Sequence, residues 1–105
     1  MRQITFFLVI LLVISCSEEK RSREADRAYV LLEEVWEKNA RGDKQAALAL
    51  ADSALSMYVT DTTRCWLMCE KAVALFDMGK MDEAISAGRV AKEFAERIGD
   101  AQKPS

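Results

Sequence analysis

The side chains that could do chemistry in this chain are its cysteines and carboxylates, because the sequence contains no histidine. Without histidine the chain lacks the commonest general base and metal ligand, and every Ser-His or Cys-His nucleophile pair. Cys65 and Cys69 are four residues apart, which places both on one face of a helix. They could form a disulfide, act as a redox pair in a thiol enzyme, or be two small core residues, and we favour the core interpretation.

The carboxylates show no catalytic pattern. Glu33-Glu34 and Asp82-Glu83 fall on helix faces or in first turns, where acidic side chains are solvated and favour the helix dipole. Each predicted turn has a single glycine, so no phosphate-binding loop is present. The net charge is −2 with no basic cluster, which argues against a nucleic-acid partner. We therefore predict a non-enzymatic protein with no catalytic residues, no metal site and no cofactor.

The N-terminal segment indicates where the protein goes. Arg2 precedes an apolar run from Ile4 to Ile14, and Ser15-Cys16 follow. The run is too short to span a bilayer, which takes about 20 apolar residues. A basic start, a short apolar core and a small residue are typical of a signal peptide, which we predict at 1–15.

Val13-Ile14-Ser15-Cys16 resembles the lipobox of bacterial lipoproteins. The resemblance implies cleavage before Cys16, attachment of diacylglycerol and a palmitate-like acyl chain to Cys16, and a location in the bacterial cell envelope. The outer membrane is then the expected membrane, with the protein facing the periplasm or the surface. The charged residues 16–23 are predicted to be a solvated tether. Ser17-Glu18-Glu19 also resembles the acidic export signal of Bacteroidetes-type surface lipoproteins, although an ordinary hydrophilic tether is an equal alternative.

The rest of the chain is predicted to be all-α. Apolar residues recur at helical spacing in four segments, at about 24–40, 43–58, 63–78 and 80–98, with no strand signal. Gly42 and Gly79 are suited to left-handed helix C-caps, Asp43 to an N-cap, and Gly99 to a final C-cap. Residues 59–63 are expected to be a connection and residues 101–105 a tail. The third segment is apolar over more than one face, which predicts a central helix packed by several neighbours.

The segments form a repeat. Gly42 and Gly79, Ala47 and Ala84, and Ala54 and Ala91 are each 37 positions apart. One helical hairpin is therefore used twice, at about 24–58 and 63–98 within a region 24–100, with a period in the solenoid range.

The stretch GKMDEAI from Gly79, followed by Ala91, resembles the tetratricopeptide repeat, and GDKQAAL from Gly42 matches its turn. The first hairpin departs from the pattern at Glu34 and Val35, and the period exceeds the family's 34 residues. The resemblance implies antiparallel hairpins stacked as a short α-solenoid. It also implies that the first helix of each hairpin lines a concave groove for peptides or partner helices.

Two rows of residues would face that groove. They are Tyr29, Leu32, Trp36, Asn39 and Ala40 on the first helix, and Trp66, Cys69, Val73, Phe76 and Asp77 on the third. Aromatic side chains with a few polar groups suit binding hot spots. We take Tyr29, Trp36, Asn39, Trp66, Phe76 and Asp77 as candidate partner-binding residues. The alternative is that the aromatic side chains simply pack between successive helices.

These observations favour a membrane-anchored lipoprotein whose tetratricopeptide-like hairpins bind a protein or peptide. The alternative is the input end of a longer membrane regulator that contains such repeats. Two hairpins are few for a solenoid, which usually needs about three repeats. We therefore expect the surface beside Ala84 to Ile98 to be covered by further repeats, by self-association or by a partner.

Overall fold

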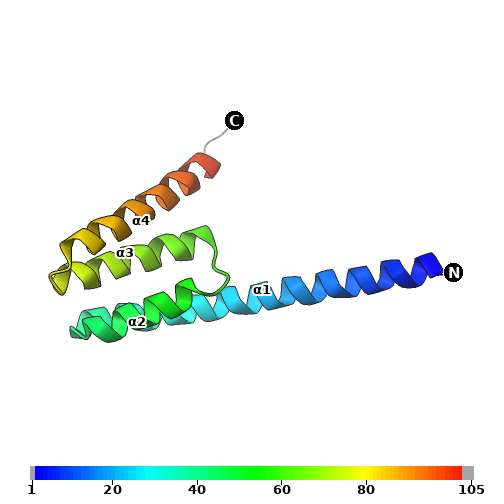
Figure 1. Cartoon of the computed structure of the whole chain (residues 1–105), viewed down its shortest axis with the longest axis horizontal. Helices are drawn as coiled ribbons and strands as arrows, with labels where there is room; N and C mark the ends of the chain where they lie inside the picture. The colour runs from blue at the N-terminus through cyan, green and yellow to red at the C-terminus, as the bar shows by residue number, and fades with distance from the viewer. Residues whose placement is uncertain (1, 103–105) are drawn as a thin grey trace.

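The computed structural model describes residues 2–102, except for the side chains of some residues before Ser17. It contains four helices and, in this described range, no strand: α1 (Arg2–Arg41), α2 (Lys44–Leu55), α3 (Asp61–Asp77) and α4 (Met81–Gln102). Each helix runs antiparallel to the one before it (Figure 1). The expected all-α class is confirmed. None of the described helices has the length and apolar character needed to cross a membrane.

The helices pack as two hairpins, α1 with α2 and α3 with α4. Helix α3 also contacts α1 and α2, so it touches all three other helices. The expectation of a central third helix is confirmed. Figure 1 shows α4 diverging from the other helices toward its C-terminal end, and the N-terminal half of α1 extending beyond them.

The two turns inside the hairpins share one geometry. Gly42 and Gly79 have φ of 83° and 79°, the left-handed region that glycine adopts without a Cβ penalty. The Gly42 N–H donates to Asn39 O at 3.1 Å, and the Asp43 N–H donates to Lys38 O at 2.9 Å. The same two bonds recur exactly one repeat later at Gly79 and Lys80. This pair of bonds is a Schellman motif, and both predicted C-caps are confirmed.

Helix α1 begins well before the predicted start at 24. Residues 17–23 are helical and exposed, so the expected tether is solvated but continues the helix. Glu, Lys, Arg and Ala dominate residues 17–28, with no glycine or proline to break the helix. Glu19 and Arg23 also form an i,i+4 ion pair at 4.0 Å.

Three other boundaries differ from the predictions. Helix α2 ends at Leu55, three residues before the expected end at 58. Residues 61–63 form the first turn of α3, and Thr60 is its N-cap, because its hydroxyl accepts from the Thr63 N–H at 3.3 Å. Val59 is buried in the core although the sequence around it indicates a connection. Gly99 lies inside α4 and does not cap it, so that prediction is wrong. The helix continues past Gly99 because no proline or competing cap lies between Gly99 and Gln102.

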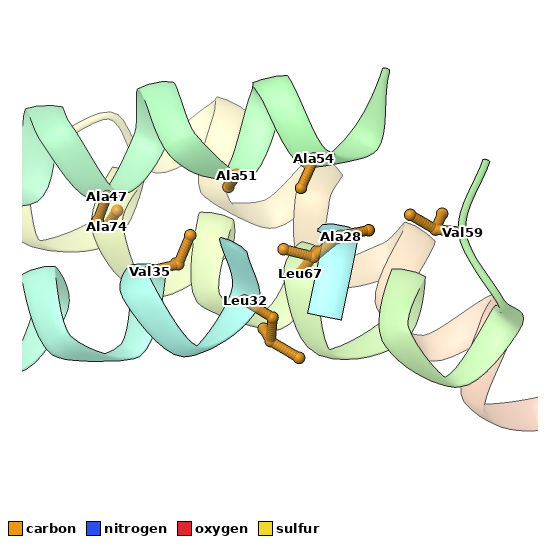
Figure 2. Packing of buried hydrophobic residues seen from close by; sticks show 9 residues of the cluster. All are labelled: Ala28, Leu32, Val35, Ala47, Ala51, Ala54, Val59, Leu67 and Ala74. Atoms are coloured by element: carbon orange, nitrogen blue, oxygen red, sulfur yellow. The ribbon is translucent and has the colours of Figure 1, made fainter. Parts of the chain in front are cut away.

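The core between the hairpins is built around small residues. Figure 2 shows Ala47, Ala51 and Ala54 of α2 directed toward α1, with Leu67 and Ala74 of α3 behind them. All five of these residues are fully buried. Alanine at these positions allows close approach of the helix backbones. This close packing fixes the outer faces of α1 and α3 relative to each other.

Candidate functional site

The four candidate aromatic side chains are exposed on α1 and α3. Tyr29, Trp36, Trp66 and Phe76 are between 37 and 58% exposed. Trp36 and Trp66 meet edge to face with ring centroids 6.1 Å apart, so they connect the two helices. We call these four residues the aromatic face. Their arrangement combines packing between helices, at Trp36 and Trp66, with apolar area left open to solvent.

The two candidate polar residues belong to a cluster at the end of α1. Asn39 Nδ2 donates to Glu70 Oε2 at 2.7 Å and to Glu70 O at 3.2 Å. Lys44 Nζ donates to Asn39 O at 2.9 Å and pairs with Asp77 Oδ2 at 2.9 Å. We call Asn39, Lys44, Glu70 and Asp77 the polar cluster. It joins α1, α2 and α3 through hydrogen bonds to charged groups, and Asp77 stays exposed at its edge.

Sequence reasoning missed two members of this cluster. Glu70 lies one helical turn after Trp66, so the spacing that selected Trp66 also indicates Glu70. Lys44 lies on α2, outside the two selected rows, and no local pattern connects it to Asp77. The structure brings them together because the turn at Gly42 reverses the chain beside α3.

Two other residues of the predicted rows, Leu32 and Cys69, do not line an open face, whereas Ala40 and Val73 are exposed. Leu32 is 1% exposed and lies in the core (Figure 2). Cys69 is half-buried. Helix α1 packs against both α2 and α3. Leu32, one turn before Trp36, is therefore covered by these helices and cannot line a groove.

The two cysteines are half-buried neighbours on α3. Both are free thiols, and the Cys65 S–H donates to Ala91 O with Sγ and O 3.4 Å apart. Burial, followed by the neighbouring Cys65, raises the pKa of the Cys69 thiol. A raised pKa disfavours the thiolate, which is the nucleophilic form. These contacts support the core interpretation over a thiol enzyme. Within the described residues no group of His, Cys, Asp or Glu has a metal-binding arrangement.

The side chain of Cys16, the predicted lipid-attachment residue, lies outside the described residues. Among the side chains described near it, Leu8, Val9, Ile10 and Leu11 are exposed on α1. An exposed apolar stretch of this kind has no core to join in the folded hairpins.

Comparison with protein-family models, with curated proteins and with solved structures found no match.

Proposed function

We propose that this chain is a bacterial envelope lipoprotein, anchored through lipid on Cys16, whose tetratricopeptide-like hairpins bind a protein or peptide. The observation that carries the binding proposal is the aromatic face. Four aromatic side chains on two helices remain 37 to 58% exposed, and the exposed carboxylate of Asp77 lies on the same helix as Trp66 and Phe76. The few residues that dominate binding energy in protein interfaces are enriched in Trp and Tyr.

The aromatic face suits an apolar or aromatic side chain of a partner. A partner side chain can lie against Trp66 or Phe76, while Asp77 accepts hydrogen bonds from the partner backbone or pairs with a cation. The polar cluster is already internally bonded, so it holds α1 against α3 and presents the aromatic face as a fixed surface. Preorganisation of this kind reduces the entropy lost on binding.

The anchor is supported by the residues before and at Cys16. The lipobox-like Val13-Ile14-Ser15-Cys16 follows a short apolar run. Two acyl chains bound to one residue hold a protein on a bilayer nearly permanently, at about 0.8 kcal/mol for each buried CH₂.

The anchor is tested by expressing the full chain in a bacterium with labelled palmitate. We expect label on the wild type and membrane fractionation, and neither with Cys16→Ala. Ser17→Ala is the matched control and should keep both. Persistent membrane fractionation of Cys16→Ala without label would refute lipid anchoring.

Binding is tested by placing a photocrosslinking amino acid at position 66 or, as control, at position 30. Trp66 and Val30 are similarly exposed, at 51 and 55%, but only Trp66 belongs to the aromatic face. We expect a discrete crosslinked protein from position 66 in the native cell envelope, and loss of that adduct when Tyr29 and Phe76 are both changed to serine. Equal adducts from both positions would contradict the proposal.

A further inference from the structure

A second apolar surface lies on the second hairpin, where α3 and α4 meet. A groove of about 450 Å³ is lined by Ala72, Val73, Phe76, Met81, Ala84 and Ile85, and we call it the end groove. Its rim residues Val73, Phe76, Met81 and Ile85 are 46 to 58% exposed. Three of these four side chains lie outside the aromatic face, which shares only Phe76 with the groove.

The matching surface of the first hairpin is not open, because α3 covers it. Positions 37 residues earlier than Ala72 and Ala84 are Val35 and Ala47, and both are fully buried. Leu48, the equivalent of Ile85, packs against the cluster that contains Leu75 of α3.

Four further contacts join the first hairpin to α3. They are Trp36 with Trp66 at 6.1 Å between ring centroids, Asn39 Nδ2 with Glu70 Oε2 at 2.7 Å, Lys44 Nζ with Asp77 Oδ2 at 2.9 Å, and Asp52 Oδ1 with Lys71 Nζ at 2.8 Å. In the second hairpin the corresponding positions are Val73, Phe76, Met81 and Arg89, and all four are exposed.

We propose that the end groove binds an amphipathic α-helix of a partner protein, seated as α3 is seated on the first hairpin. The two hairpins share their turn geometry, and Ala47 and Ala54 of the first correspond to Ala84 and Ala91 of the second, so the two surfaces can be compared position by position. A helix in a groove is also a common way to cover an apolar surface. This inference does not depend on the lipid anchor, and of the groove residues only Phe76 also belongs to the aromatic face.

The side chains that differ between the hairpins define the partner helix. Phe76 and Met81 replace Asn39 and Lys44, so the partner needs apolar residues where α3 has Glu70 and Asp77. Arg89 replaces Asp52, so the partner needs an acidic residue where α3 has Lys71. Arg89 is exposed and forms no ion pair within the described part of the chain.

A second copy of this chain supplies only part of such a helix. Seated as α3 is, its α1 would bring Glu34 to the place of Lys71, opposite Arg89, and Ala40 to the place of Asp77, but two other positions do not fit. Glu37 would occupy the place of Ala74, which is fully buried. Glu33 would face Phe76. Burial of a carboxylate without a partner is costly, so the charge pattern of α1 favours solvent over the end groove.

The test uses a designed helical peptide and the full chain in detergent solution. The peptide has the length of α3 and keeps the side chains of Trp66, Leu67 and Ala74 at the equivalent positions. It has leucine in place of Glu70 and Asp77, and glutamate in place of Lys71. Lysine, glutamine and alanine fill its other face. A second peptide differs only by lysine at the glutamate position. Binding is measured by fluorescence anisotropy.

We expect the glutamate peptide to bind the wild type at least tenfold more tightly than the lysine peptide does. Arg89→Glu should reverse that order. Ile85→Glu should weaken binding at least tenfold, whereas Val30→Glu, at an equally exposed position on α1, should leave it unchanged. Circular dichroism checks that each variant is folded.

Three results would overturn the proposal. The first is no saturable binding of either peptide, and the second is equal weakening by Ile85→Glu and Val30→Glu. The third is a dimer in sedimentation that Ile85→Glu dissociates, because the end groove would then be occupied by a second copy.

Discussion

Changing a glycine to alanine is predicted to destabilise the fold at some positions and to stabilise it at others. Gly42 and Gly79 have positive φ, whereas Gly88 and Gly99 lie inside α4, and a Cβ added at any of the four would meet no atom within 4 Å. Steric clash is therefore absent, and the effect of alanine reports the backbone conformation alone.

The magnitudes follow from that conformation. An L residue in the left-handed region is strained by about 1–2 kcal/mol, while alanine reduces the entropy of the unfolded chain by the equivalent of about 0.4–1 kcal/mol. Gly42→Ala and Gly79→Ala should each destabilise by about 1 kcal/mol net. Gly88→Ala has no strain and should stabilise the helix by about 0.5–1 kcal/mol. Gly99→Ala should act in the same direction but less, because it lies near the helix end.

The assay is thermal unfolding of the full chain, followed by circular dichroism at 222 nm. For a unit of this size, 1 kcal/mol shifts Tm by about 4–8 °C. Gly42→Ala and Gly79→Ala should lower Tm by that amount, and Gly88→Ala should raise it. A lower Tm for Gly99→Ala would refute the helical assignment of Gly99 and restore it as a C-cap. An unchanged Tm for Gly42→Ala would refute the shared turn geometry.

Three further predictions concern the packing between the helices. Leu67→Ala removes a fully buried side chain and should cost about 2–5 kcal/mol in chemical denaturation, whereas Val73→Ala, at an exposed position of the same helix, should cost under about 1 kcal/mol. Lys44→Met removes the cation of the polar cluster and should lower the free energy of unfolding by about 1 kcal/mol. Lys92→Met removes the cation of an exposed ion pair and should lower it negligibly. Equal losses for the two variants would contradict the cluster's role. Cys69 should react with iodoacetamide more slowly in the folded chain than in urea, because burial raises the pKa of its thiol; equal rates would contradict that burial.

The raised pKa of Cys69 also has a consequence for stability. A thiol whose pKa is higher in the folded state favours folding only while it is protonated, so its contribution declines as pH rises past the ordinary thiol range. Cys69→Ala should therefore lose less stability than the wild type between neutral and alkaline pH.

Much of the fold follows from local patterns in the sequence. The turns at Gly42 and Gly79 and the alanine positions of α2 and α4 were predictable because backbone strain and helical spacing act over a few residues. The burial of Val59 was not predictable, because a residue outside any helix has no periodicity to indicate its direction. Leu67 and Ala74 of α3 are fully buried, for a different reason. A helix that is apolar over more than one face indicates several neighbours, but its pattern does not show which side chains they bury.

The candidate site was predictable in its residues more than in their roles. The sequence indicated Asn39 and Asp77 as polar groups near the aromatic side chains, and the structure adds Lys44 and Glu70 as their partners. That pairing depends on where α2 returns beside α3, which is set by tertiary packing. Whether Trp36 binds a partner or packs between helices also depends on that geometry.

Because α1 is long, its two halves differ in how many contacts they make with the rest of the fold. Arg21 lies over the Tyr58 ring at 5.6 Å and Glu24 accepts from the Tyr58 N–H at 2.9 Å, and Ala28 is the first buried residue among the described side chains. Amides near Ala28 and Val35 can exchange with deuterium only when the hairpins open, whereas those near Glu19 exchange by local fraying. Unwinding or bending of α1 before Ala28 would therefore not loosen the core. The hairpins can change their orientation relative to the N-terminal end of α1 while their packing stays intact.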